Sequence, residues 1–222
     1  MNLDNFREAI DECTQLKISE PDIQKKKQLE DLENRLKKEL RNQEIQIKLK
    51  KLYYDKQFIG YICVASQLVE FKIREIILQL QQLAILLNKK FKLDKNWEDK
   101  PLGGLITILK TQCIEDEDLI KQLDSFNDLR IAAIHELFDT SIKIESVEYK
   151  IEQLTPTFSY YNRLIVPLER YRYAITNKTI EFQSEKGQIP KESMVVIEKL
   201  REKMGEIDPD LKNGDVAKNI KL

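Results

Sequence analysis

The stretch that decides the fold runs from Glu115 to Phe138 and reads EDEDLIKQLDSFNDLRIAAIHELF. Its apolar residues recur at spacings of three and four, which predicts a helix with one buried stripe; they are Leu119, Leu123, Phe126, Leu129 and Ala133. Four acids, Glu115 to Asp118, stand where negative charge stabilises the positive end of a helix. Near the other end are Arg130 and His135, the only histidine of the chain. Imidazole chemistry near neutral pH is therefore confined to this helix.

The composition around this helix indicates an almost wholly helical protein. Charged residues make up 34% of the 222 residues and aromatic residues 8%, with only six Gly and six Pro. Few helix breakers and many good helix formers favour an all-α fold. Lys and Arg number 37 against 38 Asp and Glu, so the net charge of -1 does not itself indicate nucleic-acid binding.

The cysteines and the chain's beginning predict a reducing, cytoplasmic setting. Cys13, Cys63 and Cys113 are odd in number and far apart, which argues against a disulfide framework and a structural zinc site. The first residues lack the basic start and apolar run of a signal peptide. Charged residues interrupt the most apolar region, Ile59 to Leu87, so no membrane span is expected. No cofactor or metal is expected either.

Hydrophobic periodicity divides the chain into an N-terminal charged helical arm (1–56), a helical bundle (57–183) and a C-terminal helix with a loosely held tail (184–222). The architecture expected is an up-and-down bundle with an N-terminal helical arm and a C-terminal helical appendage. Besides the helix at Glu115–Phe138, the pattern predicts helices at Leu3–Leu16, Asp22–Lys56, Gln57–Lys89, Leu105–Thr111 and Phe158–Phe182. It also predicts one helix that begins near Val147 and another that runs from Pro190 to just before Gly205.

Four connecting segments carry predictions of their own. Ile142 to Glu145 alternates briefly and is expected to be extended. Thr155-Pro156 predicts a break between two helices. Gly103 and Gly104 are expected to let backbones approach closely, and they lack phosphate-loop spacing. The final residues, Glu206 to Leu222, are expected to be loosely held.

Two charged segments allow both a structural and a functional interpretation. Asp22 to Lys56 holds eleven Lys or Arg and seven Asp or Glu, and serves either as a solvated arm or as a surface for a phosphate backbone. Glu169 to Lys178, ERYRYAITNK, interleaves arginines with tyrosines that either stack on bases or pack inward. In both cases the structural interpretation is favoured, because charged helical faces are usually solvated and tyrosines usually pack.

Arg130 and His135 are the candidate catalytic residues. Five positions correspond to about 140° of helical rotation, so the two side chains do not share one stripe, although a long arginine can still reach a shared cleft. Asp128, Ile131 and His135 do form one line. An imidazole can move the proton of a ribose hydroxyl while a guanidinium holds the phosphate, which is the chemistry of RNA cleavage. The ordinary alternative is a histidine without a catalytic role.

The segment FNDLRIAAIHELF resembles the HEPN superfamily, whose members carry Arg, four to six residues, then His near the end of a helix in a helical bundle. The resemblance covers roughly Gln57 to Phe182. It implies a homodimer that brings two Arg/His pairs into one cleft. Many such proteins are metal-independent endoribonucleases of toxin–antitoxin, CRISPR and anti-phage systems. It also implies that RNA is the substrate, that an antitoxin or defence-complex protein is a partner, and that Arg130 holds the phosphate while His135 transfers the proton.

One position departs from the family pattern. The residue after the arginine is usually polar, most often Asn, and here it is Ile131. Isoleucine cannot orient the imidazole or bond to RNA. The alternative hypothesis is therefore an inactive HEPN-like module that dimerises or binds RNA or protein, and in which His135 is buried or faces protein. A third hypothesis, a small-molecule binder, requires an apolar pocket within the bundle.

Overall fold

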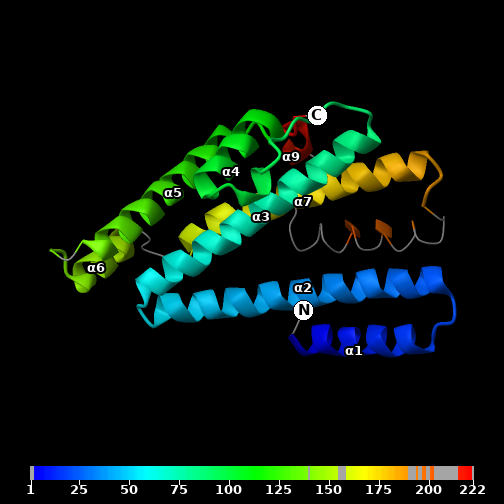
Figure 1. Ribbon diagram of the computed structural model, residues 1–222, viewed down its shortest axis with the longest axis horizontal. Coiled ribbons are helices and arrows are strands. Elements are labelled where there is room, and N and C mark those ends of the chain that lie inside the picture. The colour runs from blue at the N-terminus through cyan, green and yellow to red at the C-terminus, as the bar shows by residue number, and fades with distance from the viewer. Residues whose placement is uncertain are drawn as a thin grey trace. The chain divides into compact units, whose positions relative to one another are not determined.

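The computed structural model describes residues 3–139, 141–154, 159–189, 194, 197–198, 201–202 and 215–221. These residues form an all-α structure (Figure 1) and contain no β-strand, which confirms the predicted fold class. The chain divides into two compact units, Met1–Val64 and Ala65–Leu222, and the division falls inside one helix. The three-part division expected from the sequence stays a prediction.

The first unit is built from two helices and the beginning of a third. α1 (Leu3–Ser19) packs against α2 (Ile23–Tyr54), and α3 (Phe58–Leu86) begins after a short turn. Asp22 caps α2 because its carboxylate accepts the backbone N–H groups of Gln24 and Lys25. Glu33 is buried on α2 and accepts hydrogen bonds from two lysines, Lys17 and Lys37. The pair with Lys17 joins α1 to α2, and the pair with Lys37 lies within α2. Together they give the buried carboxylate of Glu33 the partners that a buried charge requires.

The second unit surrounds the apolar part of α3. Its other elements are α4 (Leu102–Ile108), α5 (Glu117–Phe138), α6 (Ile144–Leu154), α7 (Ser159–Glu185) and α9 (Asp215–Lys218). The core draws side chains from α3, α4, α5 and α7, so burial of apolar area holds these four helices together; it includes Val69, Ile73, Ile76, Leu80, Leu102, Leu105, Leu123, Phe126, Leu164, Leu168 and Ile175. α5 carries the buried stripe that the sequence predicts.

The beginning of α5 is fixed by Asp116. Its carboxylate accepts the backbone N–H of Leu119 at 2.9 Å and so caps the helix. The same carboxylate accepts the hydroxyl of Tyr171 on α7 at 3.0 Å. Capping is therefore what this acidic residue does in the fold, in agreement with the helix-end interpretation of the acidic run. Because Asp116 is also tied to α7, the position of α5 along the bundle is set at its N-terminal end.

The C-terminal residues 215–221 are packed, which corrects the expectation that the whole tail is loosely held. Ile220 forms an isolated antiparallel bridge with Ile114 and is only 8% exposed. The backbone N–H groups of Glu115 and Lys221 donate to the carbonyls of Asn219 and Cys113 at 2.7 and 2.9 Å. Periodicity missed this segment because its contacts are mostly backbone hydrogen bonds to a distant part of the chain.

Two further segments differ from the sequence predictions, and two lie outside the described residues. α6 begins at Ile144, so Ile142 to Glu145 is not extended as a whole. The predicted short helix starts earlier than expected, and its end, Leu109–Cys113, is a π-helical turn. The predicted break at Thr155-Pro156 and most of the predicted helix after Pro190 lie outside the described residues.

Candidate functional site

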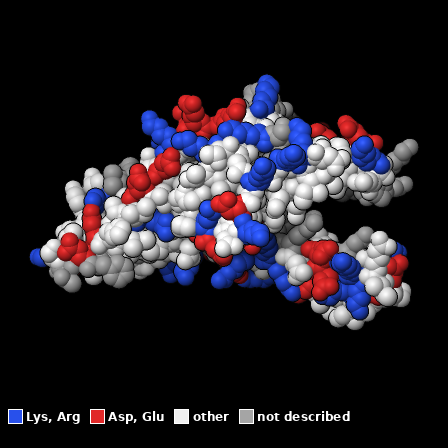
Figure 2. All heavy atoms as spheres, turned by 45° about the horizontal axis from the view of Figure 1, so that its top comes forward, with Lys and Arg blue, Asp and Glu red and all other residues white. Residues whose placement is uncertain are grey.

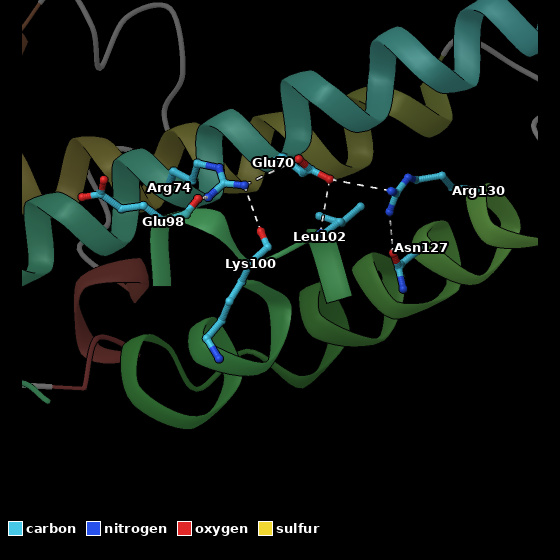
Figure 3. Close-up of polar contacts among 7 residues, drawn as sticks. All are labelled: Glu70, Arg74, Glu98, Lys100, Leu102, Asn127 and Arg130. Atoms are coloured by element: carbon cyan, nitrogen blue, oxygen red, sulfur yellow. Dashed lines mark hydrogen bonds and ion pairs between the residues drawn. The ribbon is translucent and has the colours of Figure 1, made fainter. Parts of the chain in front are cut away.

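Arg130 is held between two helices (Figure 3). Its guanidinium donates to Oδ1 of Asn127 at 3.2 Å, one turn earlier on α5, and lies 3.9 Å from Oε1 of Glu70 on α3. The side chain is 21% exposed, so part of the guanidinium remains open to solvent. These contacts restrict its rotamers, which lowers the entropic cost of using it to hold an anion.

Glu70 is the centre of this polar network. One carboxylate oxygen accepts the backbone N–H of Leu102 at 3.2 Å, and the other lies 3.7 Å from Nη2 of Arg74. Leu102 is the first residue of α4, whose cap residue provides no side-chain hydrogen bond, so Glu70 supplies the missing acceptor. Arg74 in turn donates to the carbonyls of Glu98 and Lys100. The network therefore links α3, α4 and α5 around Arg130.

Gly103 keeps room for the side chain of Asn127, which belongs to this network. A Cβ atom at this position would lie 3.2 Å from Nδ2 of Asn127, closer than most such contacts. Asn127 would then have to shift away from α4, and its bond to Arg130 would be disturbed. The glycine thus allows α4 and α5 to approach each other at the turn that orients the guanidinium.

His135 lies on an exposed face of α5. The side chain is exposed, and no hydrogen bond or ion pair joins it to the residues that the structure describes. Ile131, one turn earlier, is 41% exposed, and Asp128 is also exposed. The predicted line of Asp128, Ile131 and His135 is thus a solvent-facing stripe. Arg130 turns toward Glu70, so no direct contact joins the two candidate catalytic residues within one chain.

An acidic hollow of about 900 Å³ lies beside the first half of this stripe. Five acids and three lysines line it together with apolar and polar residues; the charged ones are Glu115, Asp116, Glu117, Asp124, Asp128, Lys110, Lys121 and Lys221. A phosphate is repelled by this surface. An anionic strand that reaches His135 must therefore approach from the side away from the hollow.

The ERYRYAITNK segment is mostly structural, as favoured from the sequence. Tyr171 is fully buried, and burial raises the pKa of its hydroxyl above the usual range. Arg172 pairs with Glu169 at 2.6 Å, and Glu169 also meets the buried Lys72 of α3 at 2.5 Å. Burial alone would raise the pKa of Glu169, but the two cations outweigh it and hold that pKa below its ordinary value. This network joins α3 to α7.

Cys113 offers no activated nucleophile. It is buried at the π-helical turn, and burial raises the pKa of its thiol to about 12. A thiol with such a pKa carries almost no thiolate at neutral pH, which is the reactive form. The structure thus gives no support to a thiol–imidazole pair of Cys113 and His135.

In the part of the chain that the structure describes, no helix has the length and apolarity to cross a membrane. Within the same residues, no group of three or more His, Cys, Asp or Glu side chains could hold a metal ion. Comparison with known proteins finds no matching family model, no matching curated protein and no matching solved structure.

Proposed function

We propose that this protein is a HEPN-like, metal-independent endoribonuclease that works as a homodimer, with Arg130 and His135 as its catalytic residues. The observation that supports the proposal most is the accessibility of His135. The inactive-module hypothesis expects a histidine that is buried or faces protein. The only imidazole of this chain is instead exposed, and it forms no hydrogen bond or ion pair with the residues that the structure describes. Arg130 adds a guanidinium whose position is fixed by Asn127 and Glu70.

The proposed reaction is an intramolecular transesterification of RNA. An imidazole takes the proton from a ribose 2′ hydroxyl, and the 2′ oxygen attacks the adjacent phosphorus. The bond from phosphorus to the 5′ oxygen breaks, and that oxygen receives a proton from the second histidine of the dimer, which enters the step as imidazolium and leaves it neutral. The products are a 2′,3′-cyclic phosphate and a 5′ hydroxyl. Arg130 stabilises the negative charge that builds up on the phosphate oxygens.

A dimer accounts for the arrangement of the two residues. Within one chain, Arg130 points toward α3 and His135 lies about 140° away around α5. A cleft shared by two copies of α5 brings an arginine and a histidine from different chains together. The exposed side chain of Ile131 next to His135 gives such an interface an apolar contact that is otherwise unfavourable in water.

Cleavage of a mixed RNA pool in the presence of a chelator tests the proposal. Wild-type protein is expected to produce fragments, and His135→Ala is expected to produce none while keeping its helical content. Asp128→Ala is the matched control, because this residue shares the exposed stripe but has no proposed role in proton transfer. The proposal fails if wild-type and His135→Ala proteins both leave RNA intact, or if they cleave it equally.

The oligomeric state is tested separately. Ile131→Asp is expected to give monomers in sedimentation equilibrium and to lose cleavage. The control is Ile85→Asp, because Ile85 is 68% exposed on α3 and far along the chain from the proposed interface. A dimeric Ile131→Asp protein with normal activity would contradict the proposed interface.

A second candidate, an RNA- or protein-binding module without catalysis, has one observation in its favour. Glu70 lies 3.9 Å from the guanidinium of Arg130 and offsets part of the charge that a phosphate would use. RNA binding by both wild-type and His135→Ala proteins, with cleavage by neither, is the result that this candidate predicts.

A further inference from the structure

A second hollow, with a different charge, adjoins the first one just before the start of α5. Its volume is about 700 Å³, and four lysines, one glutamate, one aromatic residue and one amide line it. We call it the lysine hollow; its residues are Lys89, Lys90, Phe91, Lys92, Gln112, Glu115 and Lys221. The whole chain has a net charge of -1, so this local surplus of positive charge is a segregated feature.

The lysines come from two distant parts of the chain. Lys89, Lys90 and Lys92 follow the end of α3, where Asn88 adopts a left-handed conformation with a φ of 54° and turns the chain. Lys221 belongs to the packed C-terminal segment and is fixed at both its backbone and its side chain. Its backbone N–H donates to Cys113, and its ammonium donates to the carbonyl of Lys110 at 2.8 Å.

Helix-end electrostatics explains only part of this cluster. Lysines near the carboxyl end of a helix are favourable, which accounts for Lys89 and Lys90 after α3. It does not account for Lys92, which is further along the loop, or for Lys221, which is brought in by the C-terminal segment. None of Lys89, Lys90 and Lys92 forms an ion pair with a residue that the structure describes. The like charges repel each other, and an anion in the hollow relieves that repulsion.

The floor of the hollow has an unusual backbone. Gln112 belongs to the π-helical turn Leu109–Cys113, and such turns occur frequently at functional sites. Ile114 and Ile220 bridge just beyond it and hold the C-terminal segment in place. Figure 2 shows basic side chains gathered around the C-terminal end, beside acidic side chains near the start of α5. Glu115 and Lys221 line both hollows, so the sign of the charge changes across this boundary.

We propose that the lysine hollow binds a nucleotide unit, with its phosphate on the lysine ammonium groups and its base stacked on Phe91. Lysines next to an accessible aromatic ring are the combination that single-stranded nucleic acids use, because ammonium groups hold the backbone and the ring accepts any base. Lys221 has two N–H donors left after its bond to Lys110, which suits it to a phosphate oxygen. The ligand is either a segment of an RNA strand, which rests on the proposed function, or a free nucleotide.

The hollow is separate from the proposed catalytic residues. Glu115 and His135 are twenty positions apart, which corresponds to about 30 Å along a helix. Binding in the hollow can therefore be measured without cleavage. A fluorescein-labelled oligouridine with 2′-O-methyl riboses suits this purpose, because its blocked 2′ oxygen cannot attack the phosphate.

The test measures fluorescence anisotropy of this probe with the full chain at several salt concentrations. Lys90→Ala/Lys92→Ala is expected to weaken binding roughly 25-fold near 0.1 M salt and to reduce the salt slope by about 1.4, since each single-strand phosphate contact contributes about 0.7. Phe91→Leu, which keeps an apolar side chain, is expected to weaken binding about fivefold or more. The matched control is Lys26→Ala/Lys27→Ala, which removes two exposed lysines from α2.

A second arm identifies the source of the nucleotide by titrating unlabelled ATP against each protein in a calorimeter. Binding of ATP but not of the oligouridine, lost in Lys90→Ala/Lys92→Ala, assigns the hollow to a free nucleotide. The proposal is overturned if neither probe binds, if the hollow variants bind both probes like wild type, or if the α2 control weakens binding as much as the hollow variant. Intact binding without cleavage of ordinary RNA would overturn the proposed ribonuclease and leave this site standing. Cleavage of ordinary RNA, together with unchanged probe binding in the hollow variants, would support the ribonuclease and overturn the proposed site in the lysine hollow.

Discussion

Replacing Glu70 by alanine tests the polar network around Arg130. The change removes the acceptor for the N–H of the fully buried Leu102, a hydrogen bond to a charged group that contributes about 1.5–3 kcal/mol. It also removes the charge that faces Arg130 and Arg74, and these partly exposed ion pairs contribute about 0–1 kcal/mol each. Arg74 keeps its two backbone carbonyl partners. We therefore expect a loss of about 3 kcal/mol in the free energy of unfolding.

Urea unfolding followed by tryptophan fluorescence is the appropriate assay. Trp97 is the only tryptophan, is 6% exposed, and stands next to Glu98, whose carbonyl accepts Arg74. The signal therefore reports the second unit rather than the whole chain. Glu70→Gln keeps an oxygen acceptor for Leu102 and is expected to lose only about 1 kcal/mol.

The matched control is Gln67→Ala, an exposed position one turn earlier on α3 that should change the free energy by less than about 0.5 kcal/mol. If Glu70→Ala unfolds at the same urea concentration as Gln67→Ala, Glu70 does not connect the three helices and the reasoning is wrong. A large change in the slope of the unfolding transition, in contrast, would show that the variant alters the unfolded or native ensemble.

Two further predictions concern Glu33 in the α1–α2 pair and Tyr171 on α7. Hydrogen bonds from two lysines hold the pKa of Glu33 at about 2 instead of 4.5. Its ionised form therefore stabilises the α1–α2 pair above pH 4.5, and this contribution is lost as the pH falls toward 2. Glu33→Gln should remove that part of the acid dependence in circular dichroism, and an unchanged acid profile would contradict the prediction. Tyr171→Phe loses the hydroxyl that donates to Asp116, which should cost about 1 kcal/mol. The hydroxyl also accepts the side-chain amide of Asn219 at 3.4 Å, so its loss should loosen the C-terminal segment and Cys113 should react faster with a thiol reagent. An unchanged labelling rate would show that the segment does not depend on the bond from Asn219.

The helices of this chain can be predicted from the sequence because the buried face of a helix requires apolar residues at regular spacings. The apolar stripe of the central helix and the apolar circumference of α3 appear as repeats of three and four, and both helices lie where periodicity places them. Asp22 and Asp116 precede their helices at the cap position, which sequence also signals. The acidic run predicts favourable charge at the start of α5, whereas the capping bond of Asp116 is seen only in the structure.

The polar networks could not be predicted in the same way. Glu70 and Lys72 appear in the sequence as interruptions of an apolar helix, and nothing local indicates that they pair with Arg130 and Glu169. Such contacts depend on how helices distant in sequence pack, and single residues carry no period. The one available signal is the cost of burying charge, since a charged residue in an apolar helix needs a partner somewhere.

The candidate site was likewise predictable only where helical spacing determines it. The shared line of Ile131 and His135 follows from spacing alone, whereas its exposure and the turn of Arg130 toward α3 do not. The sequence does not predict the lysine hollow either, because Lys221 is brought near the lysines after α3 by its backbone bond to Cys113. Proximity of this kind is a property of the fold rather than of any segment.

The ends of the RNA fragments test the central claim most directly. Wild-type protein in chelator is incubated with a defined RNA, and the masses of the products are measured. Arg130 and His135 acting on the ribose 2′ hydroxyl predict 2′,3′-cyclic phosphate and 5′ hydroxyl ends, and no cleavage where that hydroxyl is methylated. Fragments that end in a 3′ hydroxyl and a 5′ phosphate, or cleavage at methylated positions, would contradict the account.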